Sequence, residues 1–121
     1  MIETRTFGTY KKTLDYLNDR IGKGKLIFEE DIHNALGLEI RTINNACKAN
    51  TNLTFSKLRN SMYVQKALYF YHEEKLIEKE IAEKLGFVFL SSFCNFFKRN
   101  TGVNLKDYEY KKDKPDTDLS I

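Results

Sequence analysis

Two short segments of the chain carry hydrogen-bonding side chains at the same spacing. These side chains are Arg41, Asn45 and Lys48, followed 50 positions later (91 − 41) by Ser91, Asn95 and Lys98. Residues spaced i, i+4 and i+7 share one face of an α-helix. On such a face arginine and asparagine can pair with base edges in a DNA major groove, and lysine can bind phosphate. An ordinary solvated helix face would look similar for either set alone, but the paired arrangement favours a binding surface.

The residues around these two segments are duplicated. Lys48-Ala-Asn50-Thr51 matches Lys98-Arg-Asn100-Thr101 at an offset of 50 (98 − 48), and upstream Ile32, Leu36 and Gly37 match Ile81, Leu85 and Gly86 at an offset of 49 (86 − 37). The second copy therefore has one extra residue just after its glycine. Two copies are too few for a solenoid, which needs about three stacked units. The pattern indicates a duplicated helical module.

Each copy predicts a short helix, a tight turn at a glycine and a second helix. The expected helices span residues 29–36 and 40–50, then 79–85 and 91–100, with an opening helix at 10–20 and a connecting helix at 55–71. The connecting segment is rich in apolar residues and has neither glycine nor proline, which indicates a largely buried helix. We therefore expect an all-α fold of two helix-turn-helix subdomains (residues 1–54 and 73–110) joined by a long helix (residues 55–72), with a flexible tail at 111–121.

Composition narrows the classes of function. A chain of 121 residues with 41% hydrophobic residues and one proline suits a compact helical domain. No apolar run approaches the roughly 20 residues of a transmembrane helix, so we expect a cytoplasmic protein. The net charge of +3 permits binding to a polyanion without requiring it. The cysteines and histidines are scattered and no catalytic motif is present, so we expect no metal, no cofactor and no enzymatic activity.

The most specific motif lies in the second copy. It runs Glu80-Ile81-Ala82-Glu83-Lys84-Leu85-Gly86-Phe87 and continues with Ser91, Phe93, Phe97-Lys98-Arg99, Gly102 and Tyr108. This motif resembles the signature of the DNA-binding domain of AraC/XylS-type transcription regulators, a bacterial family. The weaker first copy and Ala67 extend the resemblance to roughly residues 10–110.

The resemblance implies a sequence-specific, monomeric DNA-binding regulator whose two recognition helices enter successive major grooves, which lie about 34 Å apart. By resemblance, the base contacts would come from Arg41, Asn44 and Asn45 and from Ser91, Cys94 and Asn95, and the phosphate contacts from Lys48, Lys98 and Arg99. The chain leaves no residues for an effector domain, so we expect control through abundance. The expected partners are double-stranded DNA in the nucleoid and, as a further candidate, RNA polymerase.

Four residues depart from the family's pattern. Phe89 and Leu90 stand where polar residues are common, Leu105 replaces a proline and Glu109 replaces an arginine. We expect Phe89 and Leu90 to pack inward, and thymine methyl groups or another protein are the alternative contacts. These residues and the modest net charge also motivate a second hypothesis, a co-regulator that keeps the fold and acts on another regulator or on RNA polymerase.

Overall fold

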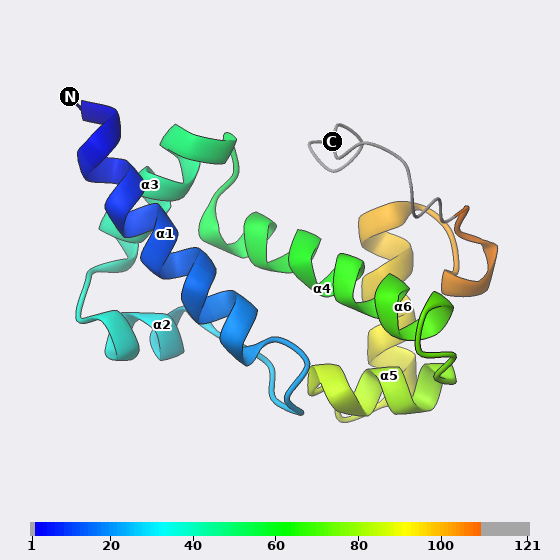
Figure 1. Ribbon diagram of the computed structural model, residues 1–121. Helices are drawn as coiled ribbons and strands as arrows, with labels where there is room; N and C mark the ends of the chain where they lie inside the picture. The colour runs from blue at the N-terminus through cyan, green and yellow to red at the C-terminus, as the bar shows by residue number, and fades with distance from the viewer. Residues whose placement is uncertain (1, 110–121) are drawn as a thin grey trace.

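The computed structural model describes residues 2–109, and the regular secondary structure of this part of the chain is all helical (Figure 1). The elements are α1 (Ile2–Arg20), α2 (Glu29–Leu36), α3 (Ile40–Thr51), α4 (Phe55–His72), α5 (Glu78–Leu85), α6 (Leu90–Thr101) and the short 3-10 helix η1 (Leu105–Asp107). None of these helices combines the length and the apolar character that a membrane-spanning segment requires. The expected all-α architecture of two helix-turn-helix units joined by a long helix is confirmed. The tail expected at residues 111–121 lies outside the described residues.

The opening helix is longer than the sequence predicted. We expected residues 10–20, and α1 begins at Ile2. The apolar periodicity of Leu14, Leu17 and Ile21 marks only the part of α1 that packs against the core. The preceding turns are mostly polar and include Gly8, so no hydrophobic repeat indicates that they are helical.

The first helix of each unit begins and ends with matching interactions. The Asp31 carboxylate accepts a hydrogen bond from the Phe28 N–H at 2.8 Å, and Glu80 accepts one from the Ile77 N–H at 3.1 Å. Each carboxylate thereby satisfies a backbone donor that a helix start leaves unpaired. Both helices end at a left-handed glycine, with φ of 68° in α2 and 101° in α5.

The recognition helices α3 and α6 also end in the same way. The amides of Asn50 and Asn100 donate to the carbonyl four residues earlier, at 2.8 Å in both helices. The hydroxyls of Thr51 and Thr101 do the same at 2.7 and 2.8 Å. The threonine hydroxyls also accept hydrogen bonds from the N–H groups of Leu53 and Val103, at 3.0 and 3.3 Å, and so bind the chain as it leaves each helix. The helices themselves end at a left-handed residue, Asn52 after α3 and Gly102 after α6.

Helix α4 forms the centre of the molecule and joins the two units, which lie at its opposite ends (Figure 1). Its buried residues are Phe55, Leu58, Tyr63, Val64, Ala67, Leu68 and Phe70. They occupy more than one side of the helix because α4 packs against α3 at its start and against α5 and α6 farther along. A helix that is buried on several sides lacks a single apolar stripe.

Tyr63 of α4 connects the two units. Its hydroxyl oxygen accepts a hydrogen bond from the Ile27 N–H at 2.8 Å, in the loop between α1 and α2. Arg59, one turn earlier, donates to the Ile27 carbonyl at 2.9 Å. The Tyr63 ring meets Phe87 and Phe96 of the second unit edge to face, with centroids 6.4 and 5.8 Å apart. One side chain thus holds the loop of the first unit against the core of the second.

The same loop packs directly against the turn of the second unit. The Gly24 N–H donates to the Lys84 carbonyl at 2.6 Å. A Cβ atom added at Gly86 would overlap the backbone nitrogen of Leu26 and lie 2.7 Å from the Lys25 Cα atom. Only glycine permits this approach, because it has no Cβ atom to clash with the loop and it tolerates the positive φ. The corresponding Gly37 of the first unit faces open space.

We expect Gly86→Ala to lower the free energy of unfolding by more than about 2 kcal/mol, because strain at positive φ adds to a backbone clash. Gly37→Ala is the matched control, where only the positive φ opposes the methyl group and the expected loss is about 1 kcal/mol. Urea unfolding of both variants measures the difference. Equal losses would show that the loop does not press on Gly86.

Candidate nucleic-acid interface

The two sets of polar side chains lie on exposed faces of α3 and α6. The exposed residues are Arg41, Asn45 and Lys48 in α3 and Ser91, Asn95 and Lys98 in α6. The opposite faces carry the buried Ile43, Ala46 and Cys47 in α3 and the buried Phe93 and Phe97 in α6. Each helix therefore anchors itself through its apolar side and leaves its hydrogen-bonding side free.

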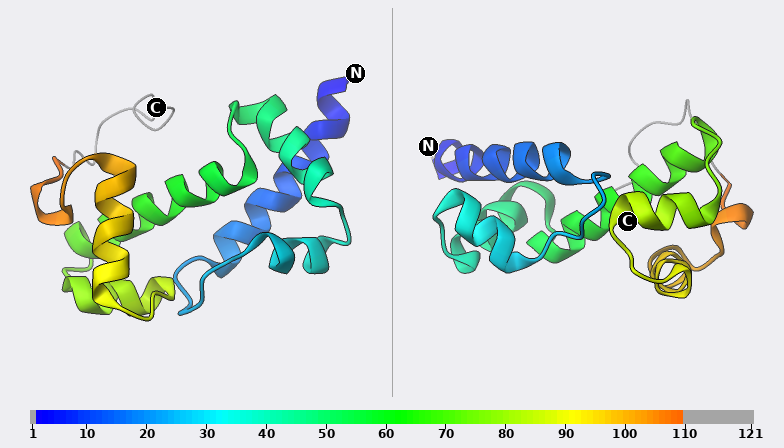
Figure 2. Two further views of the ribbon diagram at one scale, coloured as in Figure 1. Left: turned by 180° about the vertical axis from the view of Figure 1, so that it is seen from behind. Right: turned by 90° about the horizontal axis from the view of Figure 1, so that it is seen from below.

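Both recognition helices lie on the same face of the molecule. In the left panel of Figure 2, α3 lies in front of α1 and α6 lies in front of α4. The right panel, seen from below, again places α1 on the side away from α6. One straight ligand can therefore approach α3 and α6 from the same side.

Asn44 lies at the margin of the α3 face and is half-buried. Its side-chain oxygen accepts a hydrogen bond from the Phe55 N–H at 2.8 Å. Phe55 is the first residue of α4, so this N–H has no partner within its own helix. The Asn44 amide therefore fastens the recognition helix to the connecting helix.

Cys94 occupies the equivalent position in α6, 50 residues later (94 − 44), and is also half-buried. Its thiol donates to the Glu78 carboxylate at 3.4 Å. Burial and this carboxylate raise the pKa of the Cys94 thiol, so the thiol stays protonated at neutral pH. A cavity of about 220 Å³ opens beside Cys94 and is also lined by Asn104 and Leu105. In the second unit the recognition helix is thus fastened to α5 and leaves a gap toward η1.

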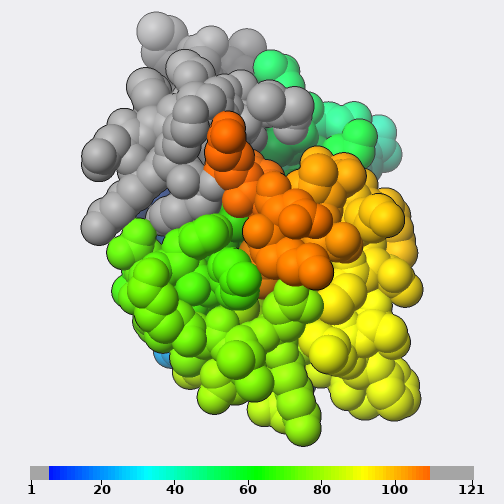
Figure 3. Space-filling view, turned by 90° about the vertical axis from the view of Figure 1, so that its right-hand side faces the viewer, coloured from blue at the N-terminus to red at the C-terminus, as the bar shows by residue number. Residues whose placement is uncertain are grey.

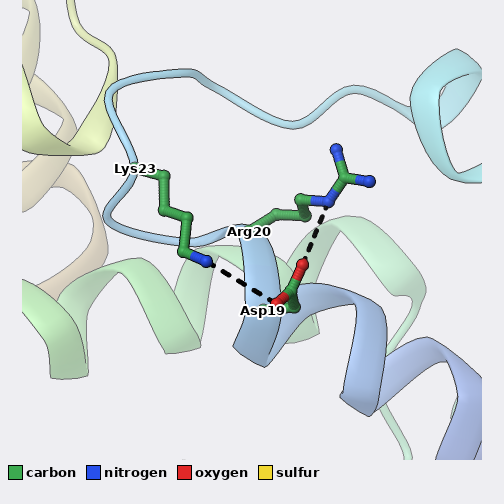
Figure 4. Close-up of polar contacts among 3 residues, drawn as sticks. All are labelled: Asp19, Arg20 and Lys23. Atoms are coloured by element: carbon green, nitrogen blue, oxygen red, sulfur yellow. Dashed lines mark ion pairs between the residues drawn. The ribbon is translucent and has the colours of Figure 1, made fainter.

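The three cations predicted to bind phosphate are exposed and lie in the last turns of their helices. Among the side chains of residues 6–109, Lys48, Lys98 and Arg99 form no ion pair. On α1 and the loop that follows it, by contrast, Asp19 pairs with both Arg20 and Lys23, at 3.3 and 3.6 Å (Figure 4). Such exposed pairs add little stability, but they place acidic charge beside the cations of that surface. Lys48, Lys98 and Arg99 have no acidic partner of this kind among the described side chains.

The start of α6 carries three exposed apolar residues. The side chains of Val88, Phe89 and Leu90 are 86%, 66% and 43% exposed. The expectation that Phe89 and Leu90 pack inward is therefore wrong. Phe87 is the residue that packs against the core, with its ring centroid 5.6 Å from that of Phe93 and edge to face with Tyr63 at 6.4 Å. In Figure 3 the start of α6 forms the yellow corner at the lower right, beside α5.

Sequence reasoning did not single out Val88, which is the most exposed of the three. The available signal was the extra residue after Gly86, because an insertion there displaces one apolar side chain from the core. Leu105, by contrast, is buried where the family has proline and packs in the core as Phe55 does in the first unit.

Metal chemistry has no support in this region. Among the described residues, no group of three His, Cys, Asp or Glu side chains could hold a metal ion. Cys47 is buried in the core, and burial raises the pKa of its thiol to about 11. That cysteine is a packing residue.

Comparisons with known proteins agree with this geometry. A family model described as a helix-turn-helix domain matches residues 32–110. Among solved structures, the chain is similar to the C-terminal domain of AraT, a response regulator from Geobacillus stearothermophilus. The TM-score is 0.72 at 17% sequence identity, over 88% of this chain and 91% of that chain. At this identity the likeness concerns the fold alone. No curated protein sequence matches the chain.

We expect Asn44→Ala to lower the free energy of unfolding by about 1–2 kcal/mol, because it leaves the buried Phe55 N–H without its acceptor. Cys94→Ala is the matched variant, and its expected cost is below about 1 kcal/mol because a thiol is a weak donor. Thermal or urea unfolding distinguishes the two. A larger loss for Cys94→Ala than for Asn44→Ala would contradict the assigned role of Asn44.

Proposed function

This chain belongs to the AraC-type helix-turn-helix family of DNA-binding transcription regulator domains, and we propose that it reads two successive major grooves of one duplex as a monomer. The observation that carries this proposal is the placement of α3 and α6 on one face, each presenting a matched set of exposed polar side chains. The N-terminal part of a recognition helix contacts base edges, and successive grooves on one side of DNA lie about 34 Å apart.

In the first unit we assign base contacts to Arg41 and Asn45. Arginine can bond guanine through two acceptors and asparagine can bond adenine in the same bidentate way. Lys48, one turn farther along the same face, is assigned to phosphate. Asn44 has its side-chain oxygen engaged by Phe55, so we assign it to positioning α3.

In the second unit the polar base contacts fall to Ser91 and Asn95, with Lys98 and Arg99 on phosphate. Cys94 is half-buried and engaged with Glu78, so it is assigned to positioning α6. Serine and asparagine form weaker hydrogen bonds with base edges than arginine does, because neither side chain is charged. The first unit should therefore supply the stronger polar discrimination.

Monomeric binding is favoured because one chain already holds two reading helices in a fixed relation. The loop contact at Gly86 and the Tyr63 hydrogen bond join the units in addition to α4. A duplex whose grooves do not match this spacing would have to bend, at an energy cost that depends on its sequence. Contact with RNA polymerase would have to use surface that DNA leaves free.

We expect in vitro selection from random duplexes to yield a bipartite site with halves about one helical turn apart. On that site Arg41→Ala should cost about 1–3 kcal/mol and relax the preference at one base pair, because a bidentate contact is lost. Lys98→Ala should weaken binding on all sequences and lower the salt slope by about one. Fluorescence anisotropy across salt concentrations measures both effects.

The control is Lys11→Ala, which removes an exposed cation of α1 that pairs with Asp15 at 3.8 Å and lies away from the proposed face. Its binding should stay close to wild type. Equal affinity for selected and scrambled DNA would disprove sequence-specific reading. Retained regulation in cells after charge reversal at Arg41 and Lys98 would instead support a co-regulator that acts through protein contacts.

A further inference from the structure

We propose that Val88, Phe89 and Leu90, which we call the apolar entry of α6, recognise thymine methyl groups in the half-site bound by the second unit. This inference rests on the proposed reading of DNA and goes beyond it by naming the base that the second unit prefers. These three side chains would recognise the base by apolar contact and without a hydrogen bond.

The exposure of the apolar entry follows from the one-residue insertion. At the offset of 50 (88 − 38), Val88, Phe89 and Leu90 correspond to Leu38, Glu39 and Ile40. In the first unit the two apolar residues of this set are half-buried and the exposed one is the glutamate. The second unit therefore presents apolar side chains where the first presents a charge.

Although the offset of 50 aligns Leu38 with Val88, it is Phe87, directly after Gly86, that takes the half-buried place against the core that Leu38 takes directly after Gly37. The Phe87 ring contacts Phe93 and Phe96 at centroid distances of 5.6 and 5.4 Å. Val88 is therefore the additional residue of the second unit, and it lies between Phe87 and the N-cap of α6. Phe89 is left outside as the N-cap residue of α6, with extended backbone (φ −119°, ψ 140°). Its exposure is thus a consequence of packing within the unit.

The apolar entry is continuous with the proposed DNA face. Leu90 is the first residue of α6, directly before Ser91, which itself lies one turn before Asn95. The first turn of α6 carries no acidic residue that would repel phosphate. A recognition helix brings its N-terminal residues closest to the base edges. Large apolar side chains at this position would therefore be inserted into the groove with the polar ones.

Thymine offers the chemistry that matches such side chains. Its C5 methyl group is the apolar group that the major groove displays, and it makes contacts with side chains such as phenylalanine. A protein partner fits less well, because a stable interface uses about 20–30 residues on each side and the apolar entry has three. A methyl group needs only a contact of a few atoms.

The test uses the full chain and the DNA site obtained by selection. We expect thymines at one or more positions of the second half-site. Replacing each with deoxyuridine removes only the methyl group and keeps every hydrogen-bonding group. Affinity should fall about fourfold for each contacted methyl, the value expected for one buried carbon. In the Phe89→Ser variant, the same replacement of thymine by deoxyuridine should lower affinity much less. Combining the replacement with Phe89→Ser, and separately with Leu90→Ser, gives double-mutant cycles that assign the methyl contact to a side chain.

Phe7→Ser is the matched control, since Phe7 is also an exposed phenylalanine but lies on α1. It should keep the wild-type response to deoxyuridine. A selected site whose second half tolerates deoxyuridine, or an equal loss in wild type and Phe89→Ser, would overturn the inference while leaving sequence-specific binding intact. If selection returned no shared sequence at all, the proposed function itself would fail. Loss of association with a regulator or polymerase in Phe89→Ser, with DNA affinity unchanged, would also overturn it.

Discussion

The arrangement of the two recognition helices depends on the contact between the turn at Gly86 and the loop that follows α1. This contact brings backbone against backbone at Leu26, and the Tyr63 hydroxyl holds the neighbouring Ile27 N–H. With α4 alone, the two units would be joined by a single helix. The added contact restricts rotation about that helix, so the relation of α3 to α6 is set before DNA is bound. A surface that is already ordered loses less entropy on binding.

The duplicated units share the interactions that shape their helices but differ in those that position them. The Asn-Thr pair in the last turn of α3 and of α6 makes almost identical hydrogen bonds in the two copies. At the equivalent margin position, however, Asn44 bonds to the start of α4 whereas Cys94 bonds to Glu78 within its own unit. Each copy therefore sets the geometry of its own helices. The orientation of α3 and of α6, by contrast, depends on a hydrogen-bond partner that the other copy lacks.

The helices and the exposed polar faces were predictable because their periodicity and end signals are local. The spacing of Arg41, Asn45 and Lys48 is enough to place them opposite a buried apolar side. Asn44 falls at the margin of that face, where the position of α4 decides whether it is free. Phe89 and Leu90 were expected to pack inward, but Phe87 is the residue that packs against Phe93, and both of the others stay exposed. Competition for one place in the core is a tertiary effect that no local pattern reports.

The inequality of the copies has a consequence for the shape of the DNA site. Symmetric dimers present the same helix twice, so their sites are palindromic. Here one chain presents an arginine and an asparagine on α3 and, on α6, a serine and an asparagine behind three exposed apolar residues. Under the proposed reading of two grooves, the two halves of the DNA site would therefore differ in sequence. A fixed connection between unlike units would also give the bound protein one orientation on DNA, so the site would have a direction.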